Sequence, residues 1–468
     1  MLAAMSVHMT RRQRPNRGDE LELTIDSLAF GGNGVARHDG YVVFVVGAVP
    51  GDRVRARVTR PKRDYAEAIT VEILEPSPER IPATAPHPGV PWQVLPYERQ
   101  LEIKAQQVEE ALRRIGRLDD FAMEPIVPAL EQWRYRNKLE YSFGTDPDGG
   151  DLVYGFHAPG HWERIVPIDD CLIASERSNV VSRQVLAWCR ERGLTAFDRR
   201  THEGFLRNLV VREGRRTGQI QARLVTMPGP LDADGLADAV DCNGLLWTQF
   251  DGVGETTALG ETELVSGSDY IDEEVNGLRF RISPHAFFQT NTEMAEKLYA
   301  LAGEYAALRG FERVYDLYCG IGTIGLTLAP RAAELWGLEL IEPAIGDAIS
   351  NARLNEIDNA RFFAGDVRVA LRELVKEAGS PDVVVVDPPR AGLSTKVVRR
   401  IIDASPKRIV YVSCNPTTLA PNAAQLVEAG YQLVKVRPVD MFPQTPHIEC
   451  VALLEAGPDG VRNPDRDA

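Results

Sequence analysis

The chain has 468 residues, of which 44% are hydrophobic and 26% charged, and its formal net charge is -14. At about 150 residues per domain, this length predicts roughly three domains. The composition excludes a disordered or collagen-like chain, and no apolar run in the sequence approaches the roughly 20 residues that a membrane span needs. The acidic total argues against a uniformly basic nucleic-acid coat but not against a local basic surface.

The six cysteines are too widely spaced for the usual zinc and redox motifs. None of them forms a CxxC pair, which disfavours a zinc ribbon or a thioredoxin-type site. The N-terminus carries no apolar signal segment. We therefore expect free thiols and a cytoplasmic protein.

The N-terminal part predicts a small β domain. Residues 1–17 are polar and arginine-rich, which is typical of a disordered basic arm. Residues 18–76 alternate like short strands between glycine turns and predict a small antiparallel barrel. Up to residue 70, eleven Lys/Arg stand against eight Asp/Glu, a balance of +3. One hairpin holds many of these cations, and two interpretations are open for it: a solvated barrel edge or a face that contacts phosphates. The hairpin's basic residues are Arg53, Arg55, Arg57, Arg60, Lys62 and Arg63.

A middle region and a C-terminal region follow. Residues 77–285 begin with a proline-rich linker, continue with an amphipathic helix over 97–118, and predict a mixed α+β domain. Over 286–457, strands alternate with helices, which predicts a doubly wound parallel α/β sheet, with a late antiparallel pair over 432–455 at its edge. Residues 458–468 predict a disordered tail.

The first strand and helix of the C-terminal region enclose a glycine motif. Gly320, Gly322 and Gly325 fit the GxGxxG spacing, and Glu339 ends the next strand. Glycines allow a ligand close to the backbone, and the acid can hold a ribose diol. A nicotinamide dinucleotide and S-adenosylmethionine both satisfy this pattern.

Three further side chains are predicted at one edge of this sheet. Asp387 ends the valine-rich strand and Cys414 ends the following one, so both face the crevice where such sheets bind ligands. The position of Cys414 before Asn-Pro and a helix N-terminus favours an activated thiolate. Glu449 begins the last strand, and an acid in that place is either a solvated edge residue or a partner of Cys414.

Together these segments resemble the RNA uracil-5-methyltransferases, which use S-adenosylmethionine. The N-terminal region resembles a TRAM domain, an OB-like β-barrel that binds RNA. The C-terminal region resembles the family's Rossmann-like methyltransferase domain. The matching segments are LAFGGNGVA (28–36), VPGD (49–52), DLYCGIGTIGL (316–326), DPPRAGL (387–393), VSCNPTTLA (412–420) and DMFPQTPHIE (440–449).

The resemblance implies roles for individual residues. Cys414 would be the nucleophile that adds to C6 of uracil, and Glu449 the base that removes the C5 proton. Asp387 would line the cofactor site and also hold the uracil edge, and Arg136 would contact RNA. The target base would have to leave its stack. The remaining cofactor-binding residues implied are Gln289, Tyr318, Gly320, Glu339 and Asp366.

One departure from the family concerns an iron–sulfur cluster. Many members hold it with three closely spaced cysteines and one further on. Here residues 86–104 contain no cysteine, although Gln100, Leu101 and Lys104 of the family's pattern are present, and Cys171 resembles the fourth ligand left alone. Four thiolates are the usual requirement, so we expect neither a cluster nor another metal.

The RNA substrate is the least specified part of this prediction. A TRAM domain favours 23S rRNA, and a transfer RNA is the alternative. A more distant alternative, from the glycine motif alone, is an NAD-dependent oxidoreductase. We expect a monomer with no membrane association.

Overall fold

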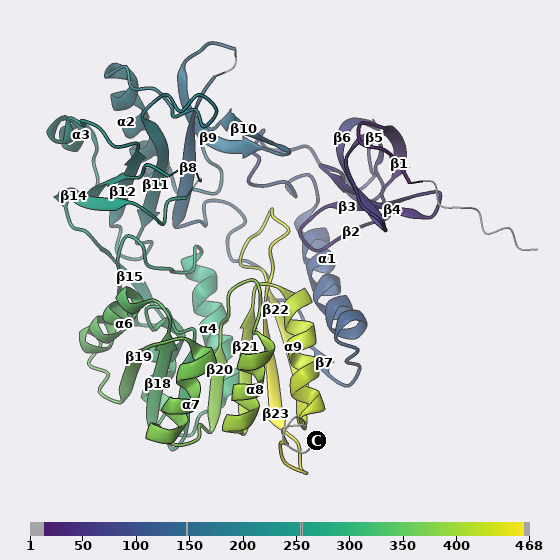
Figure 1. Cartoon of the computed structure of the whole chain (residues 1–468), viewed down its shortest axis with the longest axis vertical. Helices are drawn as coiled ribbons and strands as arrows, with labels where there is room; N and C mark the ends of the chain where they lie inside the picture. The colour runs from purple at the N-terminus through teal and green to yellow at the C-terminus, as the bar shows by residue number, and fades with distance from the viewer. Residues whose placement is uncertain (1–13, 147, 253, 255, 463–468) are drawn as a thin grey trace, which may run out of the picture. The chain divides into compact units, whose positions relative to one another are not determined.

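The computed structural model describes residues 14–146, 148–252, 254 and 256–462 (Figure 1). The disordered arm and tail predicted at the two ends fall largely outside this part of the chain. The chain divides into two compact units. One contains the residues up to 103 with the short segments 159–162 and 444–446, and the other contains the rest. The predicted α/β fold class is confirmed, whereas the division into domains at 76/77 and 285/286 stays a prediction.

The N-terminal region is one six-stranded sheet. In β4 the side chains alternate between buried and half-buried, as in a strand with one face on a core. The sheet order is β1-β5-β6-β4-β3-β2, and within the described residues no ladder joins the edge strands β1 and β2. The strands are β1 (Glu20–Thr24), β2 (Ser27–Leu28), β3 (Gly34–His38), β4 (Tyr41–Val46), β5 (Arg53–Pro61) and β6 (Tyr65–Glu75).

A buried carboxylate fixes the turn before β5. Asp52 is fully buried and accepts hydrogen bonds from the backbone N–H groups of Val49, at 2.8 Å, and Ser77, at 2.9 Å. The Arg80 guanidinium donates to both of its oxygens, at 2.7 and 2.8 Å. Although burial opposes it, these hydrogen bonds and the Arg80 charge hold the Asp52 pKa below its usual value. This network ties the sheet to the proline-rich segment that follows.

The helix predicted over 97–118 consists of α1 (Tyr97–Glu110) followed by a π-helical turn η1 (Ala111–Ile115). A seven-stranded sheet follows, in the order β10-β9-β8-β11-β12-β13-β14, with α2 and α3 against it and the hairpin β15-β16 after it. The elements are β8 (Lys138–Thr145), β9 (Leu152–Ala158), β10 (His161–Pro167), α2 (Glu176–Glu191), β11 (Leu206–Glu213), β12 (Ile220–Thr226), α3 (Ala233–Ala239), β13 (Gly244–Gln249), β14 (Glu261–Gly267), β15 (Ile271–Val275) and β16 (Leu278–Ile282).

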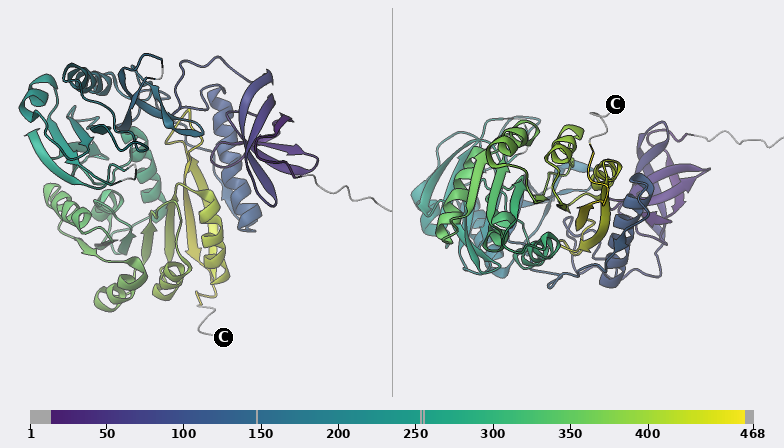
Figure 2. Two further views of the ribbon diagram at one scale, coloured as in Figure 1. Left: turned by 45° about the horizontal axis from the view of Figure 1, so that its top comes forward. Right: turned by 90° about the horizontal axis from the view of Figure 1, so that it is seen from below.

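The C-terminal region supplies seven strands of an eight-stranded sheet with helices on both faces, and β7, which precedes the central sheet in the chain, adds the eighth (Figure 2). Its order is β19-β18-β17-β20-β21-β23-β22-β7. Strands β19 to β21 run parallel, and the predicted late antiparallel pair is confirmed as β22 and β23. The strands are β7 (Ala122–Met123), β17 (Arg313–Leu317), β18 (Glu334–Glu339), β19 (Ala360–Ala364), β20 (Val383–Val386), β21 (Arg408–Ser413), β22 (Tyr431–Val439) and β23 (Glu449–Ala456).

The helices of this region begin with the residues that cap helices well. Asn291, Asp366, Ser394 and Asn415 each accept a backbone N–H in the first turn of a helix. Pro416 occupies the first turn of α9, where its missing N–H costs nothing. The helices are α4 (Thr292–Ala306), α5 (Thr323–Leu328), the 3-10 turn η2 (Ala329–Arg331), α6 (Glu342–Leu354), α7 (Val367–Ala378), α8 (Thr395–Ala404) and α9 (Pro416–Glu428).

None of the helices in the described part of the chain combines the length and the hydropathy that crossing a lipid bilayer requires.

Candidate active site

The glycine turn joins β17 to α5, as the motif predicts. Gly320 and Gly322 have positive φ angles of 53° and 85°, and a Cβ on Gly320 would meet nothing within 4 Å. A Cβ on Gly325 would lie 2.6 Å from an Asp316 oxygen, because the Gly325 N–H donates to that carboxylate at 2.8 Å. The turn is therefore open to a ligand at Gly320 and closely packed at Gly325.

Glu339 lies beside this turn. Its carboxylate accepts hydrogen bonds from the backbone N–H groups of Gly320, at 3.2 Å, and of Leu340 and Ile341, at 2.7 and 3.0 Å. The side chains of Leu340 and Ile341 are 62% and 55% exposed. A fixed carboxylate beside exposed apolar side chains suits a ligand that has both hydroxyl groups and a flat apolar ring.

Tyr318 and Asp366 adjoin Glu339. Tyr318 has a left-handed backbone at φ 65°, and its N–H donates to Leu338 O at 2.8 Å. Burial, with the negative charges of Asp366 and Glu339, raises the pKa of its phenol. Asp366 caps α7 and also pairs with the Arg368 side chain, which lowers its pKa. The structure thus groups four of the predicted cofactor-binding residues: Tyr318, Gly320, Glu339 and Asp366.

Asp316 is a buried carboxyl that the residue-level prediction missed. Its second oxygen, Oδ1, has no hydrogen-bond partner among the described residues. Burial, partly offset by the Gly325 hydrogen bond, and the charges of Asp387 and Glu339 raise its pKa to about 8. Such an oxygen suits a cationic ligand group, for example the ammonium of an amino acid. Its place at the start of the glycine motif was the available signal.

Cys414 and Glu449 come together across two neighbouring strands. In the antiparallel pair β21–β23, Ser413 is opposite Cys450. Cys414 directly follows Ser413 and Glu449 directly precedes Cys450, so both residues lie at the end of this ladder, where the charge of Glu449 acts on the Cys414 thiol. Cys414 is half-buried, Glu449 is only 4% exposed, and Asp387 directly follows the adjacent strand β20. The register therefore favours a partner of Cys414 over a solvated edge acid for Glu449.

The electrostatics of this group bear on the protonation state of Cys414. Burial, with the negative charges of Glu449 and Asp387, raises the pKa of Cys414 to about 11. Burial alone raises the pKa of Asp387 to about 7, and burial with the Asp387 charge raises that of Glu449 well above its usual value. Burial first, and then the two carboxyls, thus favour the protonated thiol of Cys414 over the thiolate at neutral pH.

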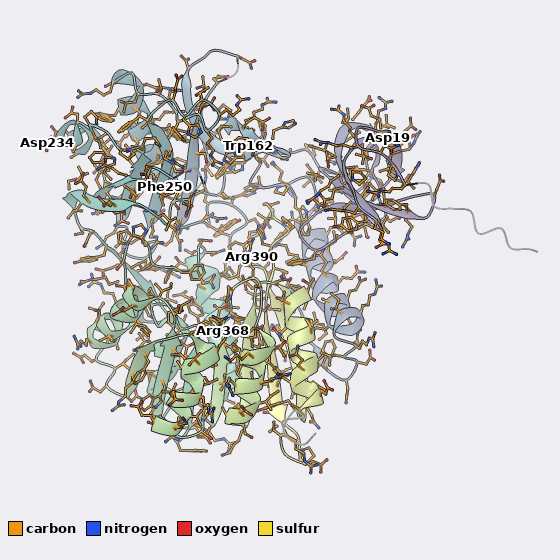
Figure 3. All side chains as sticks on the ribbon, viewed as in Figure 1. Asp19, Trp162, Asp234, Phe250, Arg368 and Arg390 are labelled. Atoms are coloured by element: carbon orange, nitrogen blue, oxygen red, sulfur yellow. The ribbon has the colours of Figure 1, made fainter. Side chains whose placement is uncertain are left out.

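Arg390 is the cation of this group. It follows Asp387-Pro-Pro and lowers the pKa values of both Cys414 and Glu449. Its backbone carbonyl accepts the Asn415 side-chain amide at 2.9 Å, which fixes the segment beside Cys414. Arg390 and Arg368 are labelled in Figure 3. Arg390 is not among the site residues that the sequence predicts, although it lies within the DPPRAGL segment.

Arg136 and His447 lie near Arg390. An Arg390 nitrogen lies 3.5 Å from His447 Nδ1, and partial burial with the charges of Arg390, Arg136 and Lys104 lowers the His447 pKa to about 4. The Arg136 backbone N–H donates to Ile173 O at 2.8 Å, and its side chain donates to Lys138 O at 2.9 Å. The predicted substrate-binding residue Arg136 is thus close enough to His447 to affect its protonation.

Gln289 is held by Asn137, which the sequence prediction left unassigned. The Asn137 amide donates to the Gln289 carbonyl and to Thr292 Oγ1, both at 2.9 Å, and its backbone N–H donates to Thr290 O at 2.8 Å. Gln289 is 6% exposed, whereas Phe287, two residues before it, is 69% exposed. Asn137 directly follows Arg136 in the chain, which was the available signal.

The basic hairpin of the N-terminal sheet is largely neutralised. Arg53 pairs with Glu22 and Glu75, Arg55 with Glu72, Arg57 with Glu20, and Arg60 with Glu67. The glutamates come from the strands on either side of β5, so the arginines form cross-strand ion pairs. Only Lys62 and Arg63 of the hairpin form no ion pair within the described residues. This favours the interpretation of a solvated edge for most of the hairpin.

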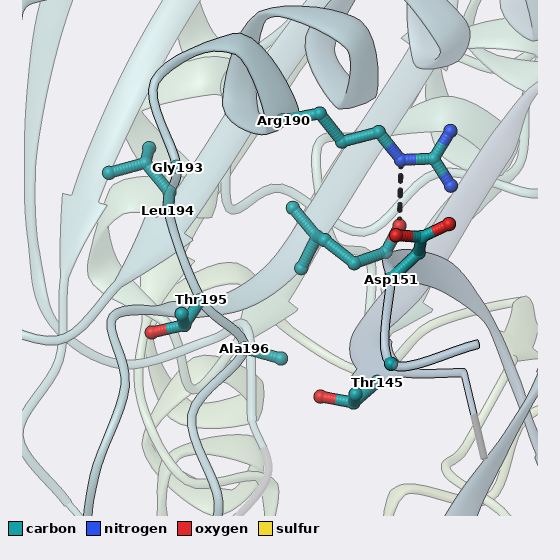
Figure 4. Close-up of a pocket in the computed structure, with 9 residues that line it drawn as sticks. Thr145, Asp151, Arg190, Gly193, Leu194, Thr195 and Ala196 are labelled. Carbon is teal, nitrogen blue, oxygen red and sulfur yellow. Dashed lines mark hydrogen bonds between the residues drawn. The ribbon is translucent and has the colours of Figure 1, made fainter. Parts of the chain in front are cut away.

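Two other features lie apart from this site. Cys171 is buried, burial raises its pKa, and its backbone N–H donates to Asn179 Oδ1 at 3.0 Å. A cavity of about 330 Å³ between Asp151 and Ala196 contains none of the predicted site residues, and across it the Arg190 side chain donates to Leu152 O at 2.8 Å (Figure 4).

Comparison with known proteins identifies the regions that carry these residues. Residues 255–457 match the model of the tRNA (Uracil-5-)-methyltransferase family, and residues 14–71 match the TRAM domain. An uncharacterized RNA methyltransferase of Clostridium tetani is 38% identical over 450 residues, covering 94% of this chain and 98% of its own. One of Bacteroides thetaiotaomicron is 39% identical over 454 residues, covering 92% and 100%.

A solved structure extends this comparison to the whole chain. The Pyrococcus abyssi tRNA (uracil-54, C5)-methyltransferase, solved in complex with S-adenosyl-L-homocysteine, is 29% identical, with a TM-score of 0.76 over 92% of this chain and 99% of its own. These findings confirm the methyltransferase prediction and leave no support for the oxidoreductase alternative. The chain belongs to the S-adenosylmethionine-dependent RNA (uracil-5-)-methyltransferases and carries an N-terminal TRAM domain.

Proposed function

We propose that this enzyme methylates C5 of a specific uridine through a covalent bond between Cys414 Sγ and C6 of the base. The observation that carries the proposal is the end of the β21–β23 ladder, where Cys414 follows Ser413 and Glu449 precedes its partner Cys450, with Asp387 directly after the neighbouring strand β20. Uracil C5 is a poor nucleophile, and addition of a thiolate to C6 makes it reactive.

S-adenosylmethionine supplies an electrophilic methyl group when it is bound. Glu339 would hold the ribose hydroxyls beside Gly320, with Tyr318 and Asp366 near the adenine. The unpartnered oxygen of Asp316 would accept the ammonium group. Gln289 and Asp387 would border the reacting end. The orphan carboxylate oxygen and the open space at Gly320 support this assignment.

Side chains of the protein then carry out the proton transfers of the reaction. Before it attacks, Cys414 must transfer its proton to an acceptor, either the Asp387 carboxylate or solvent, and the positive charge of Arg390 favours the resulting thiolate. Asp387, with a pKa of about 7, can donate to or accept from the uracil edge. After methyl transfer, Glu449 removes the C5 proton, and elimination releases Cys414. The exposed ring of Phe287 offers a stacking surface for a base that has left its helix, and Arg136 a phosphate contact.

Two substitutions test the covalent mechanism. Cys414→Ala should abolish methyl transfer and the adduct with 5-fluorouridine RNA, because no other group replaces the thiolate. Glu449→Gln should accumulate the adduct with ordinary RNA, since the C5 proton stays in place. Denaturing gel electrophoresis with labelled RNA detects the loss of the adduct in the first variant and its accumulation in the second. Cys242→Ala, which removes a half-buried thiol of the central sheet, is the matched control. An active Cys414→Ala enzyme would disprove the mechanism.

For the RNA substrate, we propose a uridine of 23S rRNA, on the strength of the TRAM domain. A tRNA is the second candidate, which the likeness to the Pyrococcus abyssi tRNA enzyme supports. Mass mapping of 5-methyluridine in both RNAs of a deletion strain distinguishes them. Loss of the modification from tRNA alone would overturn the rRNA proposal. A monomeric, cytoplasmic enzyme stays a prediction.

A further inference from the structure

One face of the central sheet collects cations that have too few carboxylates beside them. In the ladders that join β8, β11 and β12, Lys138 is opposite Arg212, and Glu140 and Arg223 are both opposite Val210. Directly opposite residues point to the same side of a sheet, as do residues two apart in a strand. Lys138, Arg212 and Arg223 therefore share one face, and His285 contacts it from the segment after β16. We call Lys138, Arg212 and Arg223 the cationic face.

The ion pairs of this face are incomplete. Lys138 pairs with Glu140 at 2.6 Å. Arg212 donates only to backbone carbonyls, those of Ser283, at 3.1 Å, and Ala286, at 2.8 Å. Arg223 has two long contacts of 3.5 Å, to Thr248 Oγ1 and His285 Nδ1. In the part of the chain that the structure describes, no carboxylate oxygen lies within 4 Å of either guanidinium.

Burial makes this shortage of negative charge costly. Arg212 is 4% exposed and Arg223 is 3% exposed. Burial lowers both pKa values, that of Arg212 to about 10, and the charges of Arg223, Lys138 and Arg212 help to lower that of His285. A buried charge without a partner is strongly destabilising, and a bound anion would remove that cost.

The cationic face borders the candidate active site. Lys138 is two residues from Arg136 and next to Asn137, which holds Gln289. Arg212 holds the carbonyls of Ser283 and Ala286, and the same segment continues to the exposed Phe287 and to Gln289. Lys138, with 23% of its side chain exposed, and the exposed His285 form the accessible rim above the two arginines.

We propose that the cationic face binds a backbone phosphate of the RNA substrate next to the target uridine. The inference rests on the proposed RNA methylation. It locates a phosphate contact beside the active site, whereas the arginines of the N-terminal hairpin already pair with glutamates. The rim residues contact the phosphate, and the buried arginines strengthen its attraction through a medium of low dielectric.

The salt dependence of RNA binding tests this proposal. A fluorescein-labelled oligouridylate is titrated with the full-length protein at several KCl concentrations, and the anisotropy gives Kd. Removing the interaction with one phosphate of a single strand should reduce the slope of log K against log salt by about 0.7. Arg223→Gln and Lys138→Gln should each weaken binding several-fold with such a reduction, whereas Arg223→Lys should keep the slope. Lys407→Gln, which removes an exposed charge before β21, is the matched control.

Each outcome either supports or overturns phosphate binding by the cationic face. Thermal stabilisation by S-adenosyl-L-homocysteine confirms that each variant is folded, and if Arg223→Gln fails this check, Lys138→Gln decides. Wild-type slopes in folded variants would overturn the cationic face while leaving RNA methylation intact. A wild-type protein that binds S-adenosyl-L-homocysteine but methylates neither rRNA nor tRNA would instead refute the proposed function.

Discussion

Cys414 is a residue whose chemistry depends on neighbours distant in the chain. Its place after β21 suggests a nucleophile, yet Glu449 and Asp387 add negative charge beside a partly buried thiol. A protonated resting thiol limits side reactions with electrophiles. The thiol then becomes reactive when it loses its proton after substrate has bound, and the nearby positive charge of Arg390 favours that loss.

Alkylation measures this protonation state. With a thiol pKa of about 11, the rate of Cys414 modification by iodoacetamide should rise about tenfold per pH unit from neutrality to about pH 10. Arg390→Met should slow the reaction at every pH in that range, because a charge that favours the thiolate is lost. Peptide mass spectrometry follows Cys414, and Arg372→Met on α7 is the control. A plateau below about pH 9 would contradict the raised pKa.

At this scale the sequence nominates site residues, whereas their protonation states depend on burial and on distant neighbours. Cys414, Asp387 and Glu449 follow from strand ends and family motifs. The protonation of the Cys414 thiol cannot be predicted in this way. It depends on burial and on carboxyls from two other strands, which no local sequence pattern shows. Asp316 and Asn137 were missed for a related reason. The role of Asp316 depends on one oxygen that has no partner among the described residues, and that of Asn137 depends on hydrogen bonds to residues about 150 positions away in the chain.

Among the elements, the segment before α4 links the central sheet to the active site. Asn137 is 3% exposed and makes three hydrogen bonds to residues 289–292. Asn137→Ala should raise KM for S-adenosylmethionine about tenfold with a smaller change in kcat, since Gln289 loses its position. Asn359→Ala, which loses hydrogen bonds to Ala329 and Ala332, is a stability-matched control. Equal KM values in both variants would argue against positioning by Asn137.

The turn before β5 gives a prediction about stability. Asp52→Asn leaves the Arg80 guanidinium without its buried carboxylate, so we expect a loss of about 3–5 kcal/mol in the free energy of unfolding. Urea denaturation followed by tryptophan fluorescence measures it. Asp26→Asn changes an exposed aspartate one residue before β2 and should alter stability by less than about 0.5 kcal/mol. A similarly small effect at Asp52 would refute the structural role of this ion pair.

Element types were largely predictable, whereas details of pairing were not. The valine-rich β20 and the antiparallel β22–β23 pair follow from composition and short connections. The glutamate partners of β5 could not be found in this way, because Glu20 and Glu72 become its neighbours only when β1 and β6 pair on either side. A count of basic residues along the hairpin therefore overstated its attraction for phosphate.

Across the whole molecule, the net charge of -14 does not show that the cations of the different sheets are paired to different extents. The N-terminal sheet holds most of its cations in ion pairs, whereas the central sheet buries two arginines that have no carboxylate partner among the residues that the structure describes. An acidic chain with a few uncompensated cations should bind RNA weakly at most places and more strongly where those cations lie. Local pairing, rather than the total, sets this pattern.

The carboxyls around the crevice have a thermodynamic consequence. Asp387 and Asp316 have pKa values of about 7 and 8, so a share of them carries protons at neutral pH. A cation lowers such pKa values and expels protons. The sulfonium of S-adenosylmethionine is positive, whereas the thioether of its product is neutral. Titration calorimetry in two buffers of different ionisation enthalpy should therefore show more protons released by the methyl donor than by S-adenosyl-L-homocysteine. Within the cycle, these carboxyls would thus rebind protons when the sulfonium becomes a thioether, which weakens their attraction for the spent product.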